Sequence, residues 1–360
     1  MKKHLHQIRR QLGLSLVELM ISITIGLILI LGMSSLLLQN KQTYYVNSST
    51  QQVQQNSRFV LHTLKSAIRH AGYSSYYADL SEASIDNILS DKNNFLWDIK
   101  DPIIGFNDIT AGQTIGGVDW NIKPETDVLM LRSIINVVPL GKETGGNELA
   151  IPTTTELKDG MIMLVADANH ASLFQATTVG PSSNNSAPVN EKMVIKIDSS
   201  SMTPGNSLSS INNHFSATTE SVIGQLDSTM FYISTGENGR PALFQASLII
   251  DNGTKAELIP VEIAPNVDNM QLIYGVDTNG DREVDAYQDA SAVANWNNVL
   301  SIQIALLLMT EGDGTAAKTS AHTFDSSDFS YKPDTSGSST GDRYLRRAFY
   351  GYSTLRNRVL

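Results

Sequence analysis

The chain has 360 residues and 41% of them are hydrophobic, so it can bury a core and is not disordered throughout. It has no cysteine, which excludes disulfides, cysteine-ligated zinc, iron–sulfur clusters and cysteine nucleophiles. The formal net charge of −10 argues against a nucleic-acid-binding surface, so we expect no nucleic-acid partner.

The N-terminus combines a basic leader with a long apolar run. The leader, residues 1–13, has no acid, and residues 14–38 carry a single charge, Glu18. At about 1.5 Å per residue, a helix over 14–38 spans the roughly 30 Å hydrocarbon core of a membrane. The positive-inside rule keeps the leader cytoplasmic and puts the rest of the chain outside. A secretory signal peptide competes with this interpretation, but the run is too long and no A-x-A site follows it.

The junction between leader and apolar run carries a motif, Gly13-Leu14-Ser15-Leu16-Val17-Glu18. This order resembles the class III signal of type IV pilins and pseudopilins. The resemblance implies that a prepilin peptidase cuts between Gly13 and Leu14 and methylates the new amino group of Leu14. Leu14 departs from the family, which usually has phenylalanine at that position.

Glu18 has a physical argument of its own. A carboxylate inside a membrane segment costs about 3 kcal/mol on insertion scales, so it needs a partner. Residue 18 lies one helical turn after residue 14, on the same face. After cleavage, the Leu14 amine of the same or a neighbouring subunit is the nearest candidate cation, which predicts a role for Glu18 in assembly. The alternative is an incidental glutamate near the cytoplasmic interface.

The helix is expected to continue past the membrane as an amphipathic segment over 39–72. No proline or glycine occurs from Gln39 to Ala71, and Gly72 is a natural C-cap. Apolar residues recur there at helical spacing. The stripe consists of Val53, Val60, Leu64 and Ile68, with Phe59, Leu61 and Ala67 beside them. We therefore predict one helix over 14–71 whose second half packs on a sheet.

The remaining residues, 73–360, predict a β-rich globular head outside the membrane. Short β-prone runs separated by Gly, Asn, Asp and Ser clusters favour an antiparallel sheet. The predicted strands are 127–132, 161–166, 173–178, 193–196, 230–234, 242–250, 270–274 and 299–308, and the long loops are 181–188, 199–221 and 312–341. The predicted fold class is α+β, a long N-terminal helix packed on an antiparallel pilin-like head with large β and loop insertions.

Further motifs along the chain are similar to those of the PilW family of minor pilins. They are Ser57-Arg58-Phe59, Ala71-Gly72-Tyr73, Ile104-Gly105-Phe106, Asp127-Val128-Leu129, Ala166-Asp167-Ala168-Asn169, Leu173-Phe174-Gln175, Tyr274-Gly275-Val276-Asp277, Arg343-Tyr344-Leu345-Arg346-Arg347 and Leu355-Arg356-Asn357-Arg358. Each motif is weak alone, but together they extend over nearly the whole chain.

The PilW resemblance implies a subunit that helps to prime and assemble the type IV pilus of a Gram-negative cell, at or near its tip. Its partners would be other minor pilins, the major pilin, the prepilin peptidase, the inner-membrane assembly platform and a tip adhesin. It would sit in the inner membrane as a single-pass protein with a periplasmic C-terminal head, and then in the pilus, which serves cell adhesion and twitching motility. The alternative is a minor pseudopilin of a type II secretion system.

A search for catalytic motifs favours a non-enzymatic protein. The seven histidines show no H-E-x-x-H spacing, and there is no G-x-S-x-G serine-hydrolase motif. A membrane-anchored periplasmic enzyme would need a catalytic set, which the sequence does not display. No cofactor is therefore expected, with the exception of one metal.

One acidic loop has the spacing of a calcium site. Oxygen-bearing side chains at Asp277, Asn279, Asp281 and Asp285 match loop positions 1, 3, 5 and 9, and Glu283 would lend its carbonyl. Arg282 replaces the usual glycine at position 6. Gln288 stands where a bidentate acid belongs, and Asp289 or Asp268 are its candidate substitutes. The alternative is an acidic Asx-turn hairpin without metal.

The C-terminus carries a local basic cluster, made of Arg343, Arg346, Arg347, Arg356 and Arg358. Two interpretations stay open for it. It is either a docking face for an acidic subunit or a solvated strand face with internal ion pairs.

Overall fold

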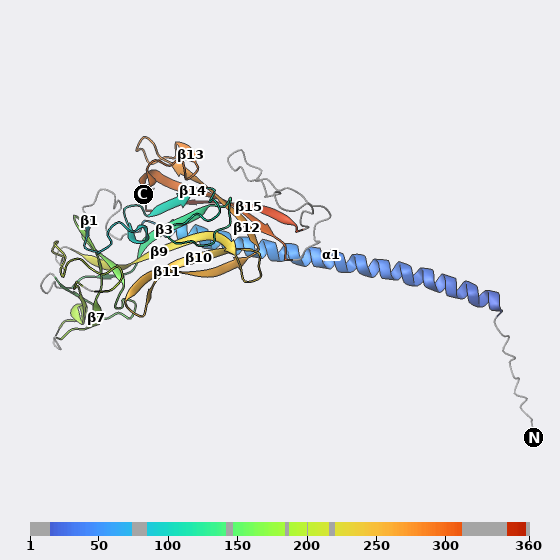
Figure 1. The fold of residues 1–360 in the computed structure, drawn as a ribbon, viewed down its shortest axis with the longest axis horizontal. Helices are drawn as coiled ribbons and strands as arrows, with labels where there is room; N and C mark the ends of the chain where they lie inside the picture. Colours follow the sequence, from blue (N-terminus) through green and yellow to red (C-terminus); the bar gives the residue numbers. More distant parts are fainter. Residues whose placement is uncertain are drawn as a thin grey trace, which may run out of the picture. The chain divides into compact units, whose positions relative to one another are not determined.

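The computed structural model describes residues 15–73, 85–141, 147–183, 187–199, 201–215, 220–311 and 344–357. Figure 1 shows the elements in chain order. The chain divides into two compact units, Met1–Gln52 and Val53–Leu360, which are taken separately below. The predicted loop over 312–341 lies outside the described residues.

A single helix, α1 (Leu16–His70), extends over 55 residues and confirms the predicted long helix. It ends where predicted, because Gly72 adopts a φ of +74°, a left-handed conformation that glycine takes without steric cost. The Gly72 amide donates to the Arg132 carbonyl at 2.8 Å. The end of α1 is thereby fixed to a strand of the head.

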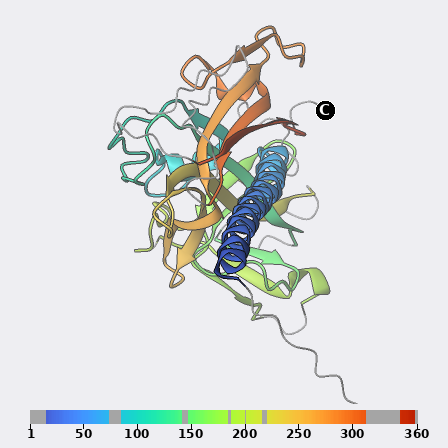
Figure 2. The same cartoon turned by 90° about the vertical axis from the view of Figure 1, so that its right-hand side faces the viewer.

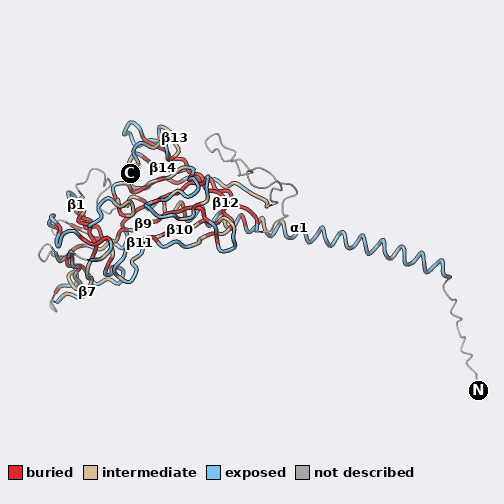
Figure 3. The backbone as a smooth tube through the Cα atoms, in the orientation of Figure 1, coloured by how far each residue is buried: buried red, intermediate tan, exposed pale blue. Residues whose placement is uncertain are grey.

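The second part of α1 buries its predicted stripe. Val60, Leu64 and Ile68 are fully buried, and they form one core with residues from the strands of two sheets. Figure 3 shows the exposed N-terminal part of α1 in pale blue and the buried strands of the head in red. Leu61 and Ala67 pack against this core, but the prediction for Phe59 is wrong: its side chain is 53% exposed, because it lies about 140° around the helix from the centre of the stripe.

The described strands form three sheets. Figure 2 gives a second view of them beside the C-terminal part of α1. The strands are β1 (Ile85–Asn87), β2 (Ile103–Phe106), β3 (Val128–Pro139), β4 (Glu148–Ile151), β5 (Ile162–Ala166), β6 (Ala171–Gln175), β7 (Thr178–Pro181), β8 (Met193–Lys196), β9 (Val222–Thr235), β10 (Pro241–Asp251), β11 (Lys255–Pro265), β12 (Val267–Val276), β13 (Ala286–Gln288), β14 (Val299–Met309) and β15 (Arg346–Thr354). The described residues also form three short 3-10 helices, η1 (Phe95–Trp97), η2 (Val189–Glu191) and η4 (Trp296–Asn298).

The largest described sheet has eight strands, in the order β1-β6-β5-β9-β10-β11, with β2 and β3 joined through β9. β9 organises it, because it pairs with β3 along one edge and with β5 and then β10 along the other. One face of this sheet contributes Leu131, Phe231 and Leu243 to the core that contains α1. The opposite face has a core of its own.

A four-stranded sheet of the described residues, in the order β13-β12-β14-β15, covers another side of the same core. β12 and β14 are almost completely buried. A third sheet, β4-β8-β7, has only three strands. All pairs of named strands are antiparallel except β1 with β6, which is parallel. The α+β prediction is thus confirmed, with one parallel pair that was not expected.

All eight predicted strands exist, although their ends shift by up to eight residues. The strand predicted at 230–234 is the C-terminal end of β9, and the one at 127–132 is the start of β3. Seven described strands were missed: β1, β2, β4, β7, β11, β13 and β15. β11 escaped prediction because Pro260 and Pro265 argue against a strand, yet both are tolerated where a strand forms the edge of a sheet.

Candidate functional site

The first turn of α1 is closed by a reciprocal capping box. The Ser15 hydroxyl accepts the Glu18 amide at 3.2 Å, and the Glu18 carboxylate accepts the Ser15 amide at 3.3 Å. This S-x-x-E pattern satisfies two helix-end donors that otherwise lack partners, and it places a negative charge at the positive end of the helix dipole. The pattern is visible in the sequence, but our prediction did not use it.

The predicted partner of Glu18 cannot be compared with this geometry, because Gly13 and Leu14 lie outside the described residues. Glu18 itself is exposed on α1. Its carboxylate therefore has two candidate roles, one in the capping box and one toward a cation from another part of the assembly. The assembly role of Glu18 stays a prediction.

Polar side chains in the apolar half of α1 bind back to the helix. The Ser22 hydroxyl donates to the Glu18 carbonyl at 2.7 Å, and the Thr24 hydroxyl donates to the Met20 carbonyl at 2.9 Å. Such bonds satisfy the hydroxyls without water. Among the described residues, α1 is the one helix long and apolar enough to cross a membrane, and its apolar side chains are exposed.

The predicted calcium loop follows β12 and is ordered by Asx turns. The Asp277 carboxylate accepts the amides of Asn279, Gly280 and Arg282 at 3.1, 2.6 and 2.8 Å. Asp285 accepts the amide and the hydroxyl of Thr278. Burial alone would raise the pKa of Asp277, but these backbone donors outweigh it and hold the pKa below its ordinary value.

Other side chains of this loop also bind within it. The Asn279 amide nitrogen donates to Asp281 at 3.1 Å and to Asp285 at 3.2 Å, while Asp281 accepts the Glu283 amide. In the described residues no three His, Asp or Glu side chains are arranged as metal ligands. These contacts are those of an acidic Asx-turn hairpin, which was the alternative to a calcium site. The calcium site stays a prediction.

The structure bears on two departures from the calcium motif, Arg282 in place of glycine and Gln288 in place of a bidentate acid. Arg282 adopts a φ of +65°, so the sharp turn normally made by glycine is present without it. Asp268 cannot replace the missing acid. It binds Lys123 at 2.7 Å and Arg346 at 2.8 Å, near the start of β12, whereas the loop follows the other end of that strand. At about 3.3 Å per residue, the nine positions between Asp268 and Asp277 span roughly 30 Å.

The described arginines of the C-terminal basic cluster differ in their surroundings. Arg346 is nearly buried and pairs with Asp268, and together with Lys123 it holds the pKa of that buried carboxyl below its ordinary value despite desolvation. Arg347 and Arg356 are exposed, while Arg343 and Arg358 lie outside the described residues. For Arg346, the structure therefore agrees with the interpretation in which the arginines form ion pairs within the chain.

Three of the motifs that suggested the family meet in the head. An added Cβ on Gly105 of β2 would lie 2.1 Å from the Tyr274 hydroxyl of β12, so only glycine leaves room for the tyrosine. Tyr274 also packs edge-to-face on Trp296 at 5.0 Å. Asp127, directly before β3, accepts the Leu272 amide at 2.7 Å and donates its own amide to the Met270 carbonyl at 3.0 Å. These motif residues therefore join β2, β3 and β12.

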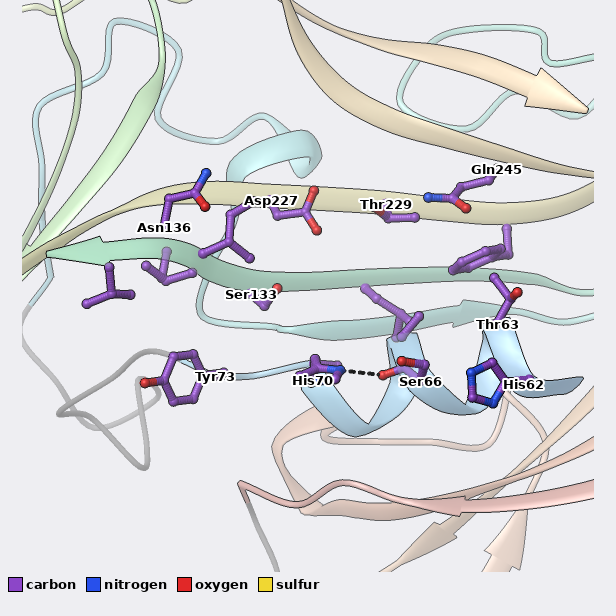
Figure 4. A pocket seen from close by; sticks show the side chains of 17 residues that line it. His62, Thr63, Ser66, His70, Tyr73, Ser133, Asn136, Asp227, Thr229 and Gln245 are labelled. Carbon is purple, nitrogen blue, oxygen red and sulfur yellow. Dashed lines mark hydrogen bonds between the residues drawn. The ribbon is translucent and has the colours of Figure 1, made fainter. Parts of the chain in front are cut away.

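A groove of about 690 Å³ lies between the last turns of α1 and strands β3, β9 and β10 (Figure 4). His62, Ser66 and His70 line its helix side, and Asp227 and Gln245 lie opposite them. The His70 Nδ1 atom is 2.7 Å from the Ser66 carbonyl. Sequence reasoning missed this groove, because its residues come from four distant elements and no motif joins them.

Two family models match the chain. The one described as type IV pilus-assembly protein W matches residues 230–357, and the one described as the prokaryotic N-terminal methylation motif matches residues 8–34. None of the curated proteins matches the chain significantly. The structure of a type IV-like pilin from Thermus thermophilus aligns over 85% of this chain and 96% of its own, at 10% identity and a TM-score of 0.34.

The methylation-motif match contains Gly13, Leu14 and Glu18, and the other match extends from the end of β9 through β15. The chain is therefore similar to proteins with the N-terminal methylation motif at its start and to the type IV pilus-assembly protein W family over its C-terminal part, and it combines one long apolar N-terminal helix with a mostly antiparallel β head.

Proposed function

We propose that this chain is a minor pilin that helps to prime and assemble a type IV pilus, at or near the tip. It acts without enzymatic chemistry, by packing its helix against those of other minor pilins and the major pilin. The observation that carries the proposal is the first half of α1, whose apolar side chains are exposed around the whole helix. A helix that is apolar all round needs lipid or other helices as its surroundings.

The same proposal gives the location and the order of events. The chain enters the inner membrane as a single-pass protein with its C-terminal head in the periplasm. The prepilin peptidase then cuts after Gly13 and methylates Leu14. The inner-membrane platform next moves the subunit into a pilus that serves adhesion and twitching, with a tip adhesin as a further partner. The matched methylation motif over 8–34 supports this order.

Glu18 is the residue that we propose to act in assembly. In lipid, helices associate through close packing and polar pairing rather than through the hydrophobic effect. A glutamate that can exchange its bond to the Ser15 amide for a methylated amine of a neighbouring subunit supplies such a pair. The capping box holds its carboxylate at the helix start, where that amine is expected.

The test is complementation of a deletion strain with the full-length Glu18→Ala variant. We expect membrane insertion to stay normal or improve, because a charge is removed, while surface pili fall at least fivefold. Ser15→Ala is the matched control, because it removes the serine half of the capping box and leaves the carboxylate. Wild-type piliation by Glu18→Ala would show that the pairing role is wrong.

The alternative, a minor pseudopilin of type II secretion, shares the helix and the N-terminal motif. The match over 230–357 to the pilus-assembly protein W model favours the pilus. Deletion separates the two, because loss of surface pili with normal protein secretion supports the pilus, and the reverse supports secretion.

We also propose that the 277–285 loop binds one calcium ion through Asp277, Asn279, Asp281, Asp285 and the carbonyl of Glu283. The left-handed backbone at Arg282 supports it, because the turn that this kind of loop requires is present. Binding would draw the carboxylates from their present backbone partners toward a common centre.

A further inference from the structure

The groove beside α1 contains one carboxyl group among its described lining residues, Asp227, which lies across the groove from His62 and His70. Asp227 of β9 is half-buried, and Thr229 of the same strand hydrogen-bonds its side chain. The groove lining, as far as the structure describes it, includes no lysine and no arginine. Desolvation raises the pKa of Asp227, which is the expected response of a carboxyl group that lacks a counter-charge.

The other residues that line the groove suit the apolar methylene stem of a long charged side chain. Leu131, Ile135 and Phe231 contribute aliphatic and aromatic surface close to Asp227, and Ile135 remains 38% exposed. Lysine and arginine bury their methylene stems along apolar surface and keep the charged end on a polar group. An anion is disfavoured by Asp227, and a single carboxylate is too few ligands for a divalent metal.

The sheet face continues beyond the groove as exposed apolar surface. Gln245, which lines the groove, pairs with Val261 of β11, and Ser247 pairs with Ile259. Directly opposite residues of an antiparallel pair share a face, and so do residues two apart on one strand. Val261, Ile249 and Ile259 are therefore on the groove side, at 58%, 44% and 36% exposure. This surface fits a polypeptide better than a small amine.

We propose that this groove takes a lysine or arginine side chain from another pilus subunit, with Asp227 as its counter-ion. Flanking apolar residues of that subunit cover Val261, Ile249 and Ile259. The identity of the partner rests on the proposed function, whereas the chemistry of the groove does not. The proposal thus adds a contact in the head to the packing of the membrane helices.

The experiment places the photo-crosslinking residue p-benzoylphenylalanine at Val261 of the full-length chain in piliated cells. We expect an adduct with a pilus subunit, in which mass spectrometry finds a lysine or arginine close to the crosslink. Val189, exposed in η2 of the same head, is the control position and should not give that adduct.

Charge dependence decides whether Asp227 is the counter-ion. Asp227→Asn should lower the adduct yield at least fivefold, and Asp227→Glu should keep at least half of it. Glu148→Gln is the matched control, because Glu148 pairs with Lys196 in the three-stranded sheet and should not change the yield. Asp227→Lys should abolish the adduct, and changing the crosslinked lysine or arginine to glutamate should restore it, which a mere folding defect would not allow.

Three outcomes would overturn the inference: an adduct confined to the chain itself, no adduct from Val261, or an adduct that Asp227→Asn leaves unchanged. Each can occur while the deletion strain still lacks pili, so the proposed function would stand. If the deletion strain instead assembles normal pili, the proposed function fails, and the charge dependence still reports on the groove.

Discussion

Asp127 connects two sheets through its carboxylate and its backbone amide, and it is only 1% exposed. Desolvation raises its pKa from 3.8 to about 7, although the amides of Asp108 and Leu272 partly oppose the rise. A raised pKa in the folded state gives stability that is present below pH 4 and is lost as the pH rises through 7. At about 1.4 kcal/mol per unit, the ionised form costs about 4 kcal/mol.

We therefore predict that Asp127→Asn flattens the pH dependence of stability between pH 4 and 7. At pH 4 the variant should be less stable by about 1–2 kcal/mol, since an amide group cannot accept both backbone donors. Urea unfolding of the head across that range, beside the wild type, measures both effects. Parallel pH profiles of the two proteins would contradict the assignment. Asp119→Asn is the control, because Asp119 is exposed and accepts the Asn121 amide within its own turn.

The calcium proposal is tested by melting curves with millimolar calcium and with chelator. Binding to the native state alone should stabilise the head by roughly 2.7 kcal/mol when calcium is at about a hundred times its dissociation constant. Magnesium should stabilise it less, because it needs a tighter octahedron. Asp277→Ala with Asp281→Ala should remove the shift, whereas Asp268→Asn should keep it. Identical melting in calcium and chelator would leave a metal-free Asx-turn hairpin.

At the scale of elements, α1 is the part that the sequence predicts best. Its limits agree within two residues, because the apolar run and the 3.6-residue stripe are local signals. The β strands were found where apolar residues form continuous runs, as in β14. Edge strands such as β11 and β15 were missed, because β11 contains prolines and β15 contains many polar residues. Whether such a segment forms a strand depends on which neighbouring elements cover its two faces.

The candidate sites also divide into those formed by neighbouring residues in the sequence and those formed by distant ones. The capping box at Ser15 and Glu18 and the Asx turns after Asp277 are local and readable in the sequence. The contact of Gly105 with Tyr274 and the groove at Asp227 arise from residues more than a hundred positions apart. Their positions depend on strand register, which a single sequence does not display.

We predict that Leu64→Ala destabilises the head by about 2–5 kcal/mol, because Leu64 is fully buried in the core that joins α1 to both sheets. Phe59→Ala is the matched control on the same helix and should change stability by less than about 0.5 kcal/mol. Thermal or urea unfolding of the two variants gives both values. A similar loss for both would mean that Phe59 is covered in the folded protein.

At the scale of the whole molecule, the proposed processing alters the charge of the chain. Cleavage between Gly13 and Leu14 would remove Lys2, Lys3, Arg9 and Arg10, which would shift the formal net charge from −10 to −14. Mass spectrometry of the mature protein should find an N-methylated Leu14. Gly13→Leu should block the cut, since a bulky residue there obstructs the peptidase. Cleavage after residue 30 or later would instead indicate an ordinary secretory signal.

Strand β15 packs on α1 from far along the sequence. Ser353 of β15 donates to the Lys65 carbonyl at 3.2 Å, and Asn357 donates to the Ala71 carbonyl at 3.3 Å, across 288 and 286 positions. Contacts at such separation form late, because a long loop must close first. During synthesis, β15 can therefore join α1 only after all the intervening residues have been made. A nascent chain stalled before residue 346 would lack Ser353, Leu355 and Asn357, which would leave this part of the α1 packing incomplete and make the chain a substrate for chaperones and proteases.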